Sequence, residues 1–207
     1  MKLRQRLRNL WLVWRLRRAG VDVGSRVQVS RDARVGQGTI LRDGVVLGWG
    51  VAIGSNCLIG PGALLENITV GDRCQIEAGV ICTGKGAGRI LIGSDSYVGI
   101  GAVLDWSAEL QIGSFVHIAG PSTGLWTHTS GKMALEGVPL GADDARTRPV
   151  APVVVGDNVY VGGNCTIYPG VRIGPHAVVA PNSAVAHDVL PGTMVGGVPA
   201  RVIKELP

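Results

Sequence analysis

The sequence predicts an all-β chain: a parallel β-helix with a short α-helix at its N-terminus and a long loop that interrupts the repeat. Three observations predict this class. Branched apolar residues recur every six positions, glycine is frequent at 32 of 207 residues, and Phe occurs once and Tyr three times. A core without aromatic packing has to be filled by Val, Ile, Leu and Ala, and such a composition favours short strands separated by turns.

Residues 1–20 form the first predicted unit, a basic amphipathic helix. Residues 2–18 carry seven Lys or Arg and no acid. Apolar residues recur at helical spacing, with Arg flanking them and covering the opposite side; they are Leu3, Leu7, Leu10, Trp11 and Trp14. Two interpretations stay open. The helix lies on an anionic membrane, or it packs on the base of the β-helix and covers an exposed sheet edge.

The remaining composition limits partners and compartment. Beyond the basic segment the chain has 13 basic and 15 acidic residues, so its body has no charge pattern for binding nucleic acid. The apolar run in the helix is too short for a signal peptide or a membrane span. The four cysteines show no CxxC or Cys/His metal spacing. We expect a cytoplasmic protein, with peripheral contact at the inner face of the plasma membrane if the helix binds lipid.

Residues 21–200 form the repeat unit. The six-residue series begins with Val23, Val29, Val35, Leu41, Leu47, Ile53 and Ile59. Each hexad makes one short strand and one turn, with Gly freeing the backbone at the corner and a small residue pointing inward. Stacked strands then give a solenoid with a continuous core. Cys57, Cys74 and Cys165 take the small inward position, so we predict core residues and not nucleophiles.

The repeat is broken at one edge of the predicted prism. Three successive hexads make one coil, so the predicted prism has three faces. The distance in sequence between successive branched residues exceeds six only between the third face of one coil and the first face of the next. It becomes 10 residues from Cys82 to Ile92, 8 from Leu104 to Ile112, and 31 from Gly124 to Val155. We expect these loops to stack and form a site on a rigid frame. The alternative is that loops accumulate at one tolerant corner.

A histidine at the largest break is the candidate base. His128 opens the loop 125–152, and an imidazole can take a proton from a hydroxyl or amine. Asp105, one coil earlier and roughly 5 Å away along the axis, is the candidate that orients the ring. The alternative is a solvated loop histidine. Candidate substrate-binding residues are Trp106, His117 and Trp126. Loop residues that suit sugar hydroxyls are Asp143, Asp144, Arg146 and Arg148.

The hexad pattern, [LIV]-G-x-x-[small]-x, resembles that of the hexapeptide-repeat family of left-handed parallel β-helices, over roughly residues 21–200. Residues 153–174, VVVGDNVYVGGNCTIYPGVRIG, and 191–206, PGTMVGGVPARVIKEL, resemble maltose, galactoside and polysaccharide O-acetyltransferases. The resemblance implies a homotrimer that transfers acetyl from acetyl-CoA to a sugar or glycan hydroxyl, with His128 as general base. That branch often has HxH or HH in the loop, whereas this chain has Thr-His-Thr at 127–129.

The resemblance also implies positions for the cofactor, which in the family runs between two subunits. They are Tyr160, Gly162, Gly163, Ala180, Asn182, Ala186, His187, Arg201 and Lys204. His117, Tyr97 and Tyr160 share one register position, so His117 lines acceptor or cofactor space or belongs to an outward surface stripe. Residues 201–207 are expected as a C-terminal tail.

Other functions stay open. Carbonic anhydrases of this fold bind zinc through three histidines, two of them spaced HxxxxH, and this chain has no such pair; we therefore expect no metal. The remaining alternatives are an N-acetyltransferase acting on an amino sugar and a non-catalytic β-helix scaffold.

Overall fold

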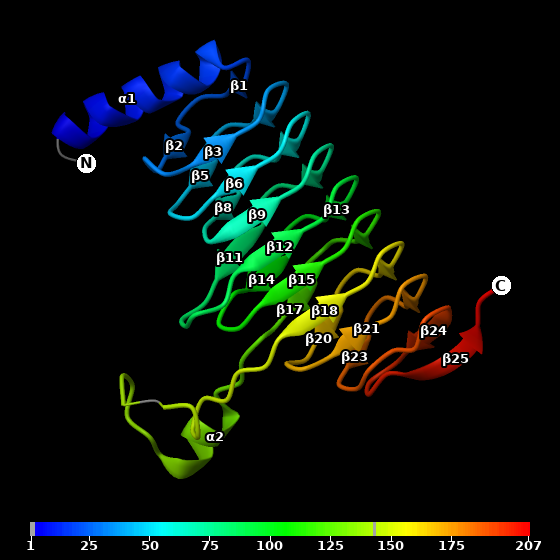
Figure 1. Cartoon of the computed structure of the whole chain (residues 1–207). Helices are drawn as coiled ribbons and strands as arrows, with labels where there is room; N and C mark the ends of the chain where they lie inside the picture. Colours follow the sequence, from blue (N-terminus) through cyan, green and yellow to red (C-terminus); the bar gives the residue numbers. More distant parts are fainter. Residues whose placement is uncertain (1–2, 143) are drawn as a thin grey trace.

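The chain winds into a three-sided β-solenoid with one helix across its first coil and one loop projecting from its middle (Figure 1). The computed structural model describes residues 3–142 and 144–207, with side chains from residue 7 onward. Nearly all strands are two or three residues long and pair in parallel with the strand one coil away. The predicted all-β class is confirmed.

Three sheets form the walls. Sheet A contains β1 (Asp22–Val23), β4 (Ile40–Leu41), β7 (Leu58–Ile59), β10 (Gln75–Ile76), β13 (Tyr97–Val98), β16 (His117–Ile118), β19 (Tyr160–Val161), β22 (Val178–Val179), β24 (Thr193–Gly196) and β25 (Arg201–Glu205). Sheet B contains β2 (Gln28–Val29), β5 (Val46–Leu47), β8 (Leu64–Leu65), β11 (Ile81–Thr83), β14 (Val103–Asp105), β17 (Gly124–Leu125), β20 (Thr166–Ile167) and β23 (Ala184–Val185). Sheet C contains β3 (Arg34–Val35), β6 (Ala52–Ile53), β9 (Ile68–Val70), β12 (Ile90–Ile92), β15 (Leu110–Ile112), β18 (Val153–Val155) and β21 (Arg172–Ile173).

The core is a single column of inward side chains from the three sheets. The branched residues of the hexads and the small residues four positions later are buried, except that Val35 is only partly buried and Ser122 is exposed. Cys57, Cys74 and Cys165 are buried at that small position, as predicted, and each thiol is free. Burial raises the pKa of Cys165, which disfavours the nucleophilic thiolate.

The repeat glycines have a different role from the one expected. Gly54 and Gly60 do not adopt a positive φ. A Cβ on Gly54 would instead lie 2.6 Å from the carbonyl oxygen of Gly71, and one on Gly60 would lie 2.5 Å from the Ala78 nitrogen. Glycine is therefore required there because successive coils approach closely, and not because the backbone turns into the left-handed region.

One irregularity lies outside the predicted edge. Leu125 is the inward residue of β17, since it pairs with both Leu104 and Ile167. The sequence pattern had placed Gly124 there. One extra residue therefore follows Ile118, around the turn that contains Pro121, and Thr123 replaces Ser122 as the small buried residue.

The larger insertions lie where the sequence places them. The segments 84–89, 106–109 and 126–152 all connect a strand of sheet B to one of sheet C, in three successive coils. The third contains α2 (Gly131–Glu136) and projects from the solenoid (Figure 1). The solenoid therefore holds three loops side by side at one edge.

Helix α1 (Leu3–Arg18) covers the open end of the first coil. Leu12 and Leu16 join the core, and the Asn9 amide pairs with the edge strand by donating to the Val27 carbonyl at 2.8 Å and accepting from the Val29 N–H at 2.9 Å. This covers an unpaired edge. The opposite side of the helix, expected to carry arginines, thus carries the packing residues.

The two faces of α1 make a stability prediction. Leu12→Ala removes a side chain that is 1% exposed and leaves a cavity under the helix, so we expect a loss of about 2–4 kcal/mol of unfolding free energy. Leu7→Ala, on the outer face at 59% exposure, is the matched control and should change stability little. Urea unfolding measures both, and equal effects would contradict this packing.

The C-terminal residues differ from the expected tail. Arg201–Glu205 form β25, which pairs antiparallel with β24 and ends sheet A. Within the described residues, no helix has the length and apolar character needed to cross a bilayer.

Candidate active site

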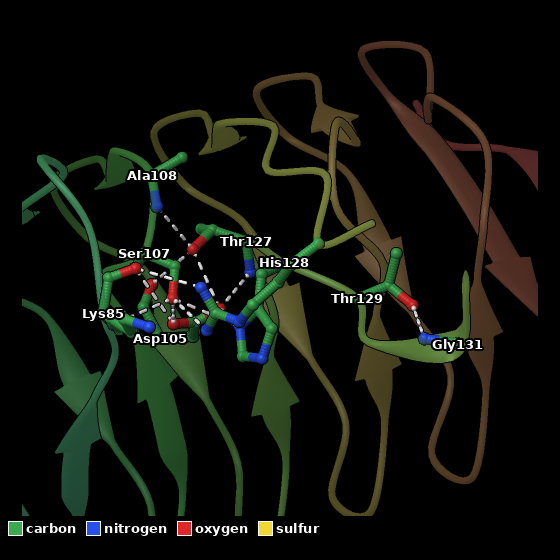
Figure 2. Close-up of polar contacts among 9 residues, drawn as sticks. Lys85, Asp105, Ser107, Ala108, Thr127, His128, Thr129 and Gly131 are labelled. Atoms are coloured by element: carbon green, nitrogen blue, oxygen red, sulfur yellow. Dashed lines mark hydrogen bonds and ion pairs between the residues drawn. The ribbon is translucent and has the colours of Figure 1, made fainter. Parts of the chain in front are cut away.

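The three stacked loops bring a histidine and an aspartate into contact. Asp105 ends β14, and His128 lies one coil later, three residues after β17. The His128 Nδ1 is 2.6 Å from the Asp105 Oδ2 (Figure 2). The residue chosen from spacing is thus the one that touches the ring; that this pair does chemistry remains a prediction.

The carboxylate of Asp105 is fully buried and accepts hydrogen bonds at both oxygens. Oδ1 accepts from the Ser107 N–H at 2.9 Å and the Ser107 hydroxyl at 2.7 Å. Oδ2 accepts from the Thr127 N–H at 2.8 Å and its hydroxyl at 2.9 Å, besides His128. Burial acts to raise the pKa of Asp105, but the hydrogen bonds from Ser107, His128 and Thr127 outweigh it and hold the pKa below its usual value.

An ionised carboxylate fixes the state of the histidine ring. Because Asp105 only accepts hydrogen bonds, Nδ1 of His128 must carry a proton, which leaves Nε2 as the basic nitrogen of a neutral ring. The side chain is 19% exposed, so part of the ring reaches solvent. Trp126 packs edge-on against the ring at 6.3 Å between centroids.

The base of the long loop holds His128 in place. Its two limbs form a short antiparallel stem, with a bridge between His128 and Val150. The Thr129 N–H donates to the Pro149 carbonyl at 3.2 Å, and the Ala151 N–H donates to the Thr127 carbonyl at 2.9 Å. A residue on a stem is positioned more firmly than one at a loop tip.

Two further side chains, Ser107 and Arg148, complete the network that holds the pair. Ser107 lies 3.2 Å from Nδ1 of His128 through its hydroxyl. Arg148, on the returning limb, donates to this hydroxyl at 3.1 Å and to the Lys85 carbonyl at 3.0 Å, so it joins all three loops. Neither Ser107 nor Thr127 is predicted as a site residue from the sequence. The only available signals were their places next to Asp105 and His128.

Thr127 gives a second stability prediction. Its fully buried hydroxyl accepts from the Ala108 N–H at 2.9 Å while donating to Asp105. Thr127→Val keeps the shape but leaves that N–H without its acceptor, so we expect a loss of about 1–3 kcal/mol. Thr129→Val, at an exposed position two residues on, is the control. Chemical denaturation compares them, and a Thr127→Val protein as stable as the control would contradict the network.

A pocket of about 570 Å³ opens beside the pair. Ser107, whose hydroxyl contacts the His128 ring, is in its wall. The remaining lining comes from Lys85, Gly86, Ala87, Gly88, Arg89, Ala108, Glu109, Asp144, Ala145, Arg148 and Val150. Asp144 also pairs with Arg146 at 2.8 Å. Asp143 lies outside the described residues.

Family models match two parts of the chain. Residues 152–187 match the bacterial transferase hexapeptide model (six repeats), and residues 50–83 match the hexapeptide repeat of succinyl-transferase. WbbJ of Escherichia coli K12, provisionally named as an O-acetyl transferase of lipopolysaccharide biosynthesis, is 31% identical over 152 residues, covering 60% of this chain and 76% of WbbJ. The chain belongs to the hexapeptide-repeat transferase family.

A second curated relative matches over a short segment, and a solved structure shares the fold. A 2,3,4,5-tetrahydropyridine-2,6-dicarboxylate N-acetyltransferase of Staphylococcus aureus is 47% identical over 55 residues, which is 27% of this chain and 23% of that enzyme. The chain thus spans about a quarter of that relative. The crystal structure of AntD, an N-acyltransferase from Bacillus cereus in complex with dTDP and 3-hydroxybutyryl-CoA, shares the fold with a TM-score of 0.59 at 20% identity, over 94% of this chain and 88% of AntD.

Trp106, a candidate substrate-binding residue, is largely buried between neighbouring loops. It is 8% exposed, stacks edge-on with Trp49, and its indole N–H donates to Glu66 at 3.2 Å. It also lies beneath Gly84, where a Cβ would come within 2.8 Å of the ring. The ring of Trp106 thus packs the loops of the hexapeptide-repeat solenoid together, and its expected role in substrate binding stays a prediction.

His117 lies on a different wall from His128. Its ring stacks between Tyr97, at 4.4 Å between centroids, and Tyr160, at 5.5 Å. The outward stripe expected on sheet A is present, since the three residues pair in register on β13, β16 and β19. Within one chain the stripe and the candidate base therefore occupy separate faces.

The candidate cofactor residues fall into three groups. Tyr160, Gly162, Gly163, Ala180 and Asn182 lie on β19 or at the turns between sheets A and B. Ala186 and His187 follow β23 on the edge that carries the insertions, and Arg201 and Lys204 are exposed on β25. Among the described residues, no cluster of three or more His, Cys, Asp or Glu has a geometry that suits a metal ion.

Two of these residues, Gly162 and Ala180, use their backbone groups in hydrogen bonds within the solenoid. Gly162 is buried, and its N–H donates to the Val179 carbonyl while its own carbonyl accepts from Thr123. Ala180 likewise donates to the Val195 carbonyl and accepts from Ser183. Their backbone groups pair between coils or within a turn, and the expected contact of both residues with a cofactor stays a prediction. The exposed candidates, among them Tyr160, Asn182 and His187, keep accessible side chains.

Proposed function

We propose that this protein is an acetyl-CoA-dependent O-acetyltransferase that acetylates a hydroxyl of a sugar or polysaccharide intermediate. The observation that carries the proposal is the contact of His128 with the buried Asp105 carboxylate, beside a pocket of about 570 Å³, in a member of a transferase family. The relationship to WbbJ supports a glycan acceptor.

The chain's residues have these roles in the proposed reaction. Asp105 holds the proton on Nδ1 of His128, and Nε2 takes the proton of the acceptor hydroxyl as its oxygen attacks. Acetyl-CoA supplies the thioester carbonyl, and its C–S bond breaks as the new ester C–O bond forms. The imidazolium, stabilised by Asp105, then returns the proton to the leaving thiolate. Proton and charge therefore balance over one turnover.

Acetyl-CoA fits the exposed candidates better than the buried ones. Arg201 and Lys204 are solvent-exposed cations at the C-terminal end of sheet A, suited to phosphate groups. Tyr160 presents a half-exposed ring on the same sheet. We assign the donor to this face of the solenoid.

A homotrimer is part of the proposal. Tyr160, the His117 stripe, Arg201 and Lys204 lie on sheet A, whereas His128 lies at the edge between sheets B and C. A closed three-fold assembly can set one subunit's sheet A against the next subunit's catalytic edge. Light scattering on the purified protein tests this, and a monomer that turns over acetyl-CoA would contradict it.

The test of the activity is acetyl-CoA turnover with a panel of sugars, measured as free-thiol release. Donor-dependent thiol release that rises with a sugar acceptor, and an alkali-labile product, is expected for O-acetylation. No turnover and no CoA binding would instead support a non-catalytic scaffold.

An amine acceptor is the second candidate. The relative from Staphylococcus aureus, 47% identical over 55 residues, is an N-acetyltransferase. The product distinguishes the two, because amides persist under the alkaline conditions that hydrolyse esters.

We place the proposed enzyme in the cytoplasm. Its four cysteines are buried and unpaired, and free thiols are typical of a reducing compartment.

A further inference from the structure

Helix α1 has a second apolar face that the described chain leaves uncovered. Leu7, Leu10, Trp11 and Trp14 are 51–60% exposed and lie opposite the packed residues Leu12 and Leu16. We call these four residues the outer stripe. The fold does not require them, since the inner face alone covers the end of the solenoid. The side chain of Leu3, expected on the same face, lies outside the described side chains.

The outer stripe is bordered by positive charge. Arg8, Arg15, Arg17 and Arg18 lie on this helix, and residues 2–18 contain no acid. The Arg18 guanidinium is 4.9 Å from the Trp14 ring centroid, and that of Arg15 is 5.6 Å from Trp11. Each tryptophan therefore sits beside a cation, an arrangement that suits the boundary between acyl chains and anionic headgroups.

We propose that the outer stripe docks this protein on an anionic lipid bilayer, with α1 lying in the plane of the headgroups. The positive charge of the helix distinguishes between a second copy of the protein and a lipid surface as the partner of the outer stripe. A second copy would bring its own arginines against these arginines, and like charges disfavour that contact. An anionic surface neutralises them while the tryptophan and leucine side chains leave water.

The position of α1 gives this docking a consequence. The helix lies at one end of the solenoid, and the His128 loop follows five strand spacings later along sheet B, from β2 to β17 (Figure 1). At roughly 4.8 Å per spacing, the candidate site lies about 24 Å along the axis from that end. Docking through α1 therefore leaves the pocket open to solvent and does not bury it in lipid.

The test is sedimentation of the full-length protein with vesicles of phosphatidylcholine alone or of phosphatidylcholine with phosphatidylglycerol. We expect binding only to the anionic vesicles, weakened by salt. The double variant Trp11→Ala/Trp14→Ala should bind about tenfold more weakly or worse. Phe115→Ala, which removes an aromatic ring 61% exposed elsewhere on the solenoid, should bind like the wild type.

Three results would overturn the proposal. They are wild-type protein that does not bind anionic vesicles, a double variant that binds as well as wild type, and a double variant whose only change is a smaller oligomer. The last would mean that another copy covers the outer stripe. Circular dichroism checks folding, and acetyl transfer to a soluble acceptor, expected to be unchanged in the double variant, reports separately on the proposed activity.

Discussion

Replacing His128 with alanine is expected to lower kcat by about 10²- to 10⁴-fold, the usual contribution of a positioned general base. The ring is held by Asp105 at 2.6 Å and by the stem of the long loop, and its Nε2 is the basic nitrogen. Alanine removes that nitrogen but leaves the buried carboxylate with its hydrogen bonds from Ser107 and Thr127. Free-thiol release from acetyl-CoA in the presence of a sugar acceptor measures the loss.

A matched histidine distinguishes catalysis from general disturbance. His176 is exposed in a turn on another edge, with a φ of 58° that asparagine tolerates. His176→Asn should retain wild-type turnover, and the His128→Ala protein should retain its fold and its affinity for CoA. Full activity in a folded His128→Ala protein would move the chemistry away from this loop.

The fold was predictable because the spacing of the buried residues in a periodic sequence equals the length of the repeating structural unit. A branched residue every six positions is buried when each hexad forms one wall of a coil, so the short strands and the buried cysteines follow directly. The number of walls, three, follows from the family resemblance. The insertions were predictable for the same reason. A spacing other than six residues between successive branched residues marks an insertion. Because three hexads make one coil, the position of the insertion within its coil shows at which edge it lies.

Counting does not show how neighbouring coils touch. The repeat glycines were assigned to turns, but Gly54 is needed because its Cα lies against the backbone of the next coil. The extra residue near Pro121 was missed because Gly124 also follows the six-residue spacing, whereas pairing shows that Leu125 points inward. Where two neighbouring residues could both take the inward position, the six-residue spacing does not show which of them does.

Site residues were predictable where they carried recognisable chemistry. His128 and Asp105 stood out by residue type and by position in adjacent loops. Trp106 stood out equally, but its ring turns into the space beneath the neighbouring loop. Arg148 was noted only as a residue suited to sugar hydroxyls, because its reach across two coils to Ser107 and Lys85 depends on the path of the long loop.

Replacing Asp105 with asparagine is expected to lower both stability and activity. The Ser107 N–H points at Oδ1 and the Thr127 N–H points at Oδ2, so an amide NH₂ opposes a backbone donor in either orientation. We expect a loss of about 2–4 kcal/mol from this buried network. We also expect kcat to fall about 10²-fold or more, because the asparagine no longer fixes the proton on Nδ1 of His128. Denaturant unfolding and thiol release measure the two effects.

The pH dependence of stability separates loss of the charge from simple loss of packing. Hydrogen bonds hold the pKa of Asp105 below its usual value, which is about 4 in an unfolded chain. The stabilisation from the ionised carboxylate is therefore complete above about pH 4 and is lost as the pH falls through the lower folded value.

The free energy of unfolding of the wild type should exceed that of Asp105→Asn by a constant margin from about pH 5 to 8, and the margin should shrink at lower pH. Glu109→Gln, which changes a carboxylate in the same loop that does not touch the ring, should show no such margin. A difference between wild type and Asp105→Asn that is independent of pH down to about 3 would mean that folding does not lower the pKa of Asp105. A difference that grows as the pH falls from 8 to 5 would mean that folding raises this pKa and that the carboxyl is protonated in the folded protein. His128 would then lack the charged partner on which the proposed mechanism depends.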